Sequence, residues 1–138
     1  MSEKQKAVAL RFFEEADRGI TPVELLSPGF TAYFNGVPPM DTAAFDELET
    51  SMRTAFSDIR HRIEGVVAKD NDVAVRLIFE ASHTGDFMGV LPSGTRVAVD
   101  GSAFLRIAED KIATLWGFLD QLALMQQIGG LPTPSQVR

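Results

Sequence analysis

The sequence contains no cysteine, so it offers no disulfide framework, no thiolate nucleophile and no thiolate metal ligand. Positive charge is also scarce, because 13 Lys and Arg stand against 19 Asp and Glu, for a net charge of −6. A nucleic-acid partner is therefore not expected, since it would need clustered cations to neutralise its phosphates. No apolar run approaches the roughly 18 residues of a membrane span. Residues 1–6 lack the apolar core of a secretion signal. We expect a cytoplasmic protein with no membrane partner.

Histidine is nearly as scarce, with only His61 and His83 in the chain. Two histidines on separate predicted strands, without cysteine, do not give the ligand spacing of a zinc site. The glycine-rich segment from Gly85 to Gly94 lacks the lysine of a phosphate-binding loop. We therefore expect neither a metal nor a cofactor.

The 138 residues are expected to form one domain over 1–138, with residues 130–138 as a polar tail. Helix signals dominate the first part. A helix is predicted from Ser2 to the stop at Gly19, a short one begins at Thr21-Pro22, and another begins at Asp41 or Thr42. The apolar face of that last helix consists of Phe45, Leu48, Met52 and Phe56.

Strand signals dominate the second part, after a short predicted strand at 30–34. Alternating segments are predicted at 59–68, 73–83, 96–108 and 112–120, and a short helix follows at 122–128. Helices first and a strand meander later are typical of an α+β fold. We expect a curved antiparallel sheet with the helices on one face.

Strand register decides which side chains face the core, because side chains alternate along a strand. A two-residue turn at Glu109-Asp110 would set Trp116 opposite Ala103 and turn Phe118 and Asp120 inward. A three-residue loop between the first two long strands would set His61 opposite Phe79 and Ile63 opposite Leu77. Both histidines and Asp120 are therefore predicted on the inner face.

The outer face would then carry apolar side chains at Ala98, Phe104, Leu115 and Leu119. Large apolar patches are seldom left exposed on monomers. A homodimer is expected.

The chain resembles the SnoaL-like polyketide cyclases, of the nuclear-transport-factor-like superfamily, whose pattern runs roughly H-x-G-x-F-x-G-x-x-P-T-G, then an arginine, G-K-I, W-x-x-x-D and Q-x-G. The matching positions are His83, Gly85, Phe87, Gly89, Ser93, Gly94, Arg106, Lys111, Ile112, Trp116, Asp120, Gln127, Ile128 and Gly129. The resemblance implies a cone-shaped α+β domain with helices on the concave face of the sheet. Phe34 and Arg106 stand where relatives often carry histidine.

In these cyclases, an acid at the position of Asp120 acts as general acid/base in an aldol ring closure. The resemblance thus predicts Asp120 as catalytic, with His83 orienting it or the substrate. Alternatively, Asp120 caps the final helix and His83 is a satisfied core residue. The predicted binding residues for a small hydrophobic molecule are Tyr33, Asn35, His61, Phe87, Met88, Trp116 and Phe118.

Three functions follow from these residues. The first is cofactor-independent cyclase or isomerase chemistry on a hydrophobic carbonyl compound. The second is a dimeric module that binds a small hydrophobic ligand without catalysis, which the absent histidines favour. The third is an epoxide hydrolase of the limonene-epoxide type, in which Tyr33, Asn35 and Asp120 would hold the water.

Overall fold

A computed structural model describes residues 2–132 of the chain, so residues 133–138 of the predicted tail lie outside the described residues. Its elements, in chain order, are α1 (Ser2–Asp17), the 3₁₀ turn η1 (Val23–Leu25), β1 (Leu26–Phe34), α2 (Thr42–Ala55), β2 (Phe56–Lys69), β3 (Asp72–His83), β4 (Arg96–Ala108), β5 (Lys111–Leu119) and α3 (Gln121–Gln127).

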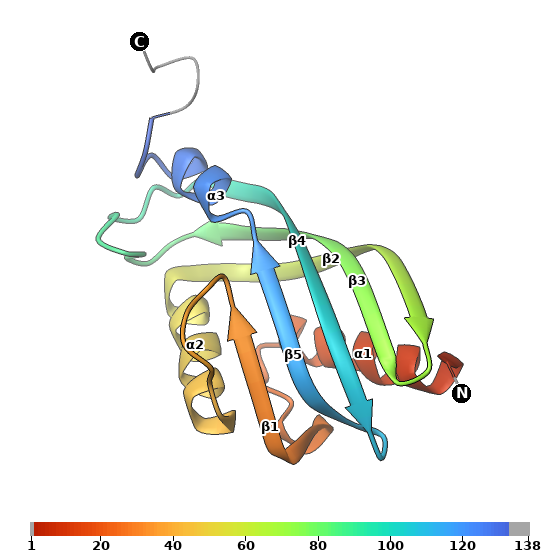
Figure 1. Cartoon of the computed structure of the whole chain (residues 1–138). Helices are drawn as coiled ribbons and strands as arrows, with labels where there is room; N and C mark the ends of the chain where they lie inside the picture. The colour runs from red at the N-terminus through yellow and green to blue at the C-terminus, as the bar shows by residue number, and fades with distance from the viewer. Residues whose placement is uncertain (1, 133–138) are drawn as a thin grey trace.

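The strands form one curved sheet in the order β1-β5-β4-β3-β2. Helices α1 and α2 cover one face of this sheet, whereas α3 sits at the far end of β4 and β5 (Figure 1). The expected α+β class is confirmed. The sheet is mixed, however: β2 to β5 pair antiparallel as predicted, while β1 runs parallel to β5.

Helix α2 follows the predicted signals closely. Asp41 caps it, with Oδ1 accepting a hydrogen bond from the Ala44 amide at 2.9 Å. Its apolar side faces the sheet, where Phe45 packs against Phe12 of α1 and Phe30 of β1. The two helices and the sheet therefore share one hydrophobic core.

The first hairpin reaches its predicted register by a different route. His61 pairs with Phe79 and Ile63 with Leu77, as expected. The loop holds only Asp70 and Asn71, because Lys69 pairs with Asp72. An irregularity between Ile63 and Gly65 then shifts the register by one residue. The pairing beyond it is therefore the one that a three-residue loop would have given.

The second hairpin contradicts the predicted orientation of β5. Its two-residue turn is as expected, since Ala108 pairs with Lys111. A bulge then shifts the register, so that Ile107 pairs with Ile112 but Arg106 with Thr114. Trp116 consequently pairs with Phe104 rather than Ala103. A slip of one residue moves every side chain of a strand to the opposite face.

The inner face of β5 is therefore formed by Leu115, Gly117 and Leu119, and Trp116 and Phe118 point outward. The prediction that Leu115 and Leu119 belong to the outer face is wrong for the same reason. Phe104 does lie on the outer face, where it is 38% exposed.

None of the helices among residues 2–132 is long and apolar enough to cross a membrane.

We predict that Gly85→Ala destabilises the fold by about 1–3 kcal/mol, the usual cost of overpacking. A Cβ at Gly85 would lie 2.1 Å from the Thr54 carbonyl oxygen, at the end of α2. The Gly85 amide also donates to the Ala55 carbonyl at 2.9 Å, which leaves the loop little room to move. Urea unfolding measures the change.

The matched control is Gly65→Ala, where a Cβ meets nothing within 4 Å. Equal stability of the two variants would contradict the close contact at Gly85.

Candidate functional site

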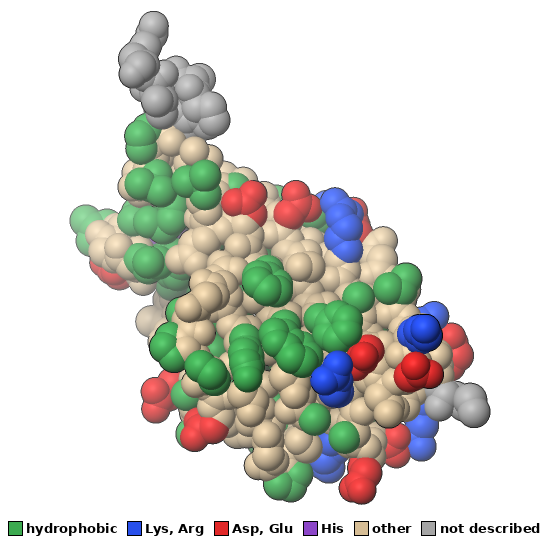
Figure 2. Space-filling model, in the orientation of Figure 1, with side chains coloured by type: hydrophobic (Ala, Val, Ile, Leu, Met, Phe, Trp, Pro, Cys, Tyr) green, Lys and Arg blue, Asp and Glu red, His purple; other side chains and the backbone are tan. Residues whose placement is uncertain are grey.

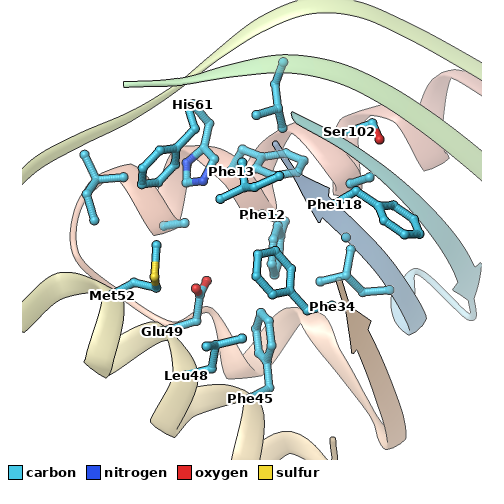
Figure 3. Close-up of a pocket in the computed structure, with 18 of the residues that line it drawn as sticks. Phe12, Phe13, Phe34, Phe45, Leu48, Glu49, Met52, His61, Ser102 and Phe118 are labelled. Carbon is cyan, nitrogen blue, oxygen red and sulfur yellow. The ribbon is translucent and has the colours of Figure 1, made fainter. Parts of the chain in front are cut away.

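The main cavity lies between the two long helices and the concave face of the sheet, with an interior volume of about 100 Å³. Its walls are largely aromatic and aliphatic side chains, including Phe12, Phe13, Phe34, Phe45, Leu48, Met52, Ile59, Leu77, Phe79, Leu115 and Leu119. Polar side chains also line it: Glu49, Arg53, His61 and Ser102. Glu49 and His61 extend into the cavity from opposite walls (Figure 3).

Glu49 belongs to the inward face of α2, together with Phe45, Leu48 and Met52. Burial raises the pKa of its carboxyl above the usual value, because an apolar cavity disfavours the charged form. His61 and Arg53 lower this pKa and Asp46 raises it, and burial is the largest of these effects. Such a carboxyl can release and recover a proton nearer to neutral pH than an ordinary glutamate can.

His61 is held by Asp17, the last residue of α1. The Asp17 carboxylate accepts from the His61 amide at 3.0 and 3.1 Å, and Asp17 Oδ1 lies 2.7 Å from Nδ1 of the ring. A carboxylate can only accept, so Nδ1 carries the proton. Nε2 is therefore the nitrogen left for chemistry in the cavity. Phe13 and Phe79 pack against the ring at centroid distances of 5.3 and 5.7 Å.

Asp120 is not in this cavity. Its side chain is exposed and caps α3, with Oδ1 accepting from the Ala123 amide at 3.0 Å. It borders a separate open hollow on the other side of the sheet, beside Arg76 and Asp100. The prediction that Asp120 faces inward is wrong, because the bulge in the second hairpin moves the side chains of β5 to the opposite face of the sheet.

His83 is fully buried and packs against Phe56, outside the cavity lining. Its Nδ1 accepts from the Ser93 amide at 3.1 Å and lies 2.8 Å from the Ser93 hydroxyl. These contacts tie the loop after β3 to the end of that strand. Nε2 has no hydrogen-bond partner among residues 2–132. Placement on the inner face is as predicted, but His83 is not brought near Asp120.

Tyr33 and Asn35 do not reach the cavity either. Tyr33 stacks on Trp116 at 5.9 Å on the outer face. The Asn35 side chain bonds both the amide and the carbonyl of Leu119, at 3.1 and 2.9 Å, so it joins the ends of β1 and β5. None of the three residues that the epoxide-hydrolase alternative would use to hold the water lines the cavity.

The remaining predicted contacts are also dispersed. Phe87 packs against Phe56 at 5.1 Å, and Met88 is 66% exposed on the same loop. Phe118 contributes to the cavity lining, but its side chain is 53% exposed and its ring points away from the cavity (Figure 3). His61 is therefore the one predicted site residue whose polar side chain the structure places in the cavity.

Sequence reasoning missed Glu49, Arg53 and Asp17. The signal for Glu49 was present: it follows Phe45 by one helical turn and falls on the face that Leu48 and Met52 define. A carboxyl on an apolar helix face is costly to bury unless it is paired or hydrogen-bonded, so its presence there marks a candidate functional residue. The contact between Asp17 and His61 joins distant parts of the chain, and no local sequence pattern predicts it.

The family model for SnoaL-like polyketide cyclases matches residues 7–128. The chain belongs to the SnoaL-like polyketide cyclase family. The match spans most of α1, all of α2 and the whole sheet, so it includes every residue that lines the cavity.

Solved structures share this fold. AclR of Streptomyces galilaeus, described as a candidate hydroxylase, superposes with a TM-score of 0.89 at 26% identity, over 96% of this chain and 89% of that chain. A candidate SnoaL-like polyketide cyclase from Jannaschia sp. CCS1 gives 0.85 at 23% identity, over 95% of each chain. IdmH of Streptomyces antibioticus, a candidate polyketide cyclase, gives 0.82 at 20% identity, over 91% of this chain and 98% of that one.

A search of curated proteins finds no match. Among the residues that the structure describes, no group of three or more His, Asp or Glu could hold a metal ion.

We predict that Glu49→Gln stabilises the protein at neutral pH. A carboxyl with a raised pKa when folded loses its proton more readily in the unfolded chain, so stability falls as pH rises between the two pKa values. Below the unfolded value both states are protonated, and the advantage of the variant shrinks. Urea unfolding between pH 4 and 8 measures the trend.

Glu47→Gln is the control, because Glu47 is exposed on the same helix. A stability difference between wild type and Glu49→Gln that stays constant with pH would contradict the raised pKa.

Proposed function

We propose that this protein catalyses proton transfer beside a carbonyl group in a small hydrophobic compound, as in an aldol ring closure or an isomerisation. The observation that carries the proposal is the Glu49 carboxyl, with its raised pKa, opposite His61 in an apolar cavity. Perturbed acids and bases in a cleft are typical of catalytic sites. Family membership supports the same class of chemistry.

In this proposal, ionised Glu49 removes a proton from the carbon next to the carbonyl, which leaves an enolate. His61 in its protonated form donates from Nε2–H to the carbonyl oxygen and stabilises the enolate, while Nδ1–H stays on Asp17. In a ring closure the enolate carbon bonds to a second carbonyl carbon, whose oxygen then takes the proton that Glu49 removed, and the Glu49 carboxylate is restored. In an isomerisation the proton returns to another carbon. Neither course changes the oxidation state, so neither needs a redox partner.

The cavity volume limits the part of the substrate that is enclosed. At about 100 Å³ it approaches the size of a site for one six-membered ring, since an apolar cavity of about 150 Å³ accepts benzene. Met52 and Phe34 can widen it by rotating, because each is only half-buried. We propose that one ring or a comparable segment occupies the interior and that the remainder extends outward.

The test is exchange of the α-protons of phenylacetone in deuterated buffer, followed by proton NMR. We expect wild type to accelerate exchange. Glu49→Gln should lower the exchange rate by about 10²–10⁴-fold, the usual contribution of a positioned acid/base. His61→Asn should also reduce the rate.

The comparison variant is Asp120→Asn, which removes a helix cap but no cavity group. Loss of exchange in Asp120→Asn with full activity in Glu49→Gln would contradict the assignment and return the role to Asp120. Binding of phenylacetone without any exchange would favour a non-catalytic module.

We also propose that the chain forms a homodimer through the outer face of the sheet. Hydrophobic side chains gather across the middle of the face that β1, β5 and β4 present (Figure 2). They include an aromatic group of Tyr33, Phe104 and Trp116, with the Arg106 guanidinium 5.5 Å from the Trp116 ring centre. Aromatic residues and arginine are the types enriched in protein interfaces.

We predict that Phe104→Glu converts the protein to a monomer, because a buried unpaired carboxylate is costly in an interface. Light scattering measures the mass. Val67→Glu is the control, since Val67 is an exposed apolar residue on β2, at the other edge of the sheet. A monomeric wild type would contradict the dimer.

A further inference from the structure

We infer that the substrate carries an anionic oxygen group, such as a carboxylate, and that Arg53 binds it. The inference rests on the proposed function and adds the substrate class. It comes from a second hollow that adjoins the main cavity at the end of α1, with a volume of about 270 Å³. Ala16, Arg53 and Ile59 line both spaces, so Arg53 stands at their junction.

The two spaces differ in character. The main cavity is lined chiefly by apolar side chains, whereas Asp17, Arg18, Ser57 and Asp58 contribute to the second hollow. A molecule that spans the junction would therefore place an apolar part inside and a polar part outside. This matches a substrate longer than the main cavity can enclose.

Arg53 is held in place by neutral partners. Its Nη2 donates to the hydroxyl of Thr21 at 3.1 Å and lies 3.4 Å from that of Thr50. The ion pairs within residues 2–132 include none to Arg53 at 4.0 Å or less. Guanidinium donors remain for a ligand, and arginine is suited to carboxylate because its planar fork can bind both oxygens.

The acids that line the second hollow are engaged elsewhere. Asp17 holds His61 at 2.7 Å, and Asp58 lies 3.6 Å from the Arg96 guanidinium. The other cation of the hollow, Arg18, pairs with Glu15 at 3.5 Å. Arg53 is thus the cation at the junction whose charge no described carboxylate neutralises in direct contact.

The position of Arg53 also suits the chemistry. It follows Glu49 by one helical turn of α2, so both side chains project from the same face. An anion on Arg53 would hold a substrate with its reacting carbon near the Glu49 carboxyl. Arg53 therefore acts as a binding and positioning residue.

The experiment compares phenylacetate with phenylacetamide, which have the same shape but differ in charge, by calorimetry at pH 7.5. Wild type should bind phenylacetate about tenfold more tightly, the size expected for a charge-assisted hydrogen bond over a neutral one. Arg53→Gln should abolish this preference, and Arg53→Lys should keep part of it. Thermal unfolding checks that each variant is folded.

Two further variants separate this inference from the proposed function. Arg62→Gln, on the outer face of β2, should keep the preference because it lies outside both spaces. Glu49→Gln should also keep it, since loss of the acid stops exchange but leaves the anion site. Equal affinity for the two probes in wild type, no binding of either, or an unchanged preference in Arg53→Gln would overturn the inference.

Discussion

The site depends on one unfavourable interaction, the enclosure of the Glu49 carboxyl in an apolar cavity. Helix α2 cannot bury Phe45, Leu48 and Met52 against the sheet without carrying Glu49 inward, because these residues share one face. Desolvation then raises the pKa of the carboxyl. The packing that stabilises the domain is therefore also what prepares the acid. Part of the stability gained from the apolar neighbours is lost at neutral pH, where ionisation is resisted.

The charged groups of the site depend on the two helices. Glu49 and Arg53 lie on α2, whereas His61 and Ser102 come from the sheet. His61 is nevertheless oriented by Asp17, the last residue of α1. Relative movement of the helices would consequently misplace the charged groups more than the apolar walls. The pairing of Phe12 with Phe45, which joins α1 to α2 at 6.1 Å, limits such movement.

Element types, most element bounds and the family could be predicted from the sequence, because these follow from local signals such as the Asp41 cap and from motif residues. The face of the sheet to which each β5 side chain points could not be predicted. A bulge needs no particular residue, so nothing at Ala113 distinguishes the regular hairpin from the shifted one. The same kind of irregularity near Glu64 preserved the predicted register in the other hairpin. The sequence allowed Asp120 to be either a helix cap or a catalytic acid. The choice between these roles depended on the face to which the β5 side chains point.

The bulge also explains why a cavity exists. With the shifted register, Gly117 faces inward and pairs with Ala103, so the floor of the cavity consists partly of the smallest side chains. The regular register would instead direct Trp116 and Phe118 inward, and two large rings would occupy the space in front of Glu49. Space at Gly117 is already limited, since a Cβ there would lie 3.2 Å from the Phe34 ring. One extra residue in a strand thus separates an aromatic outer face from an inner face with room for a ligand.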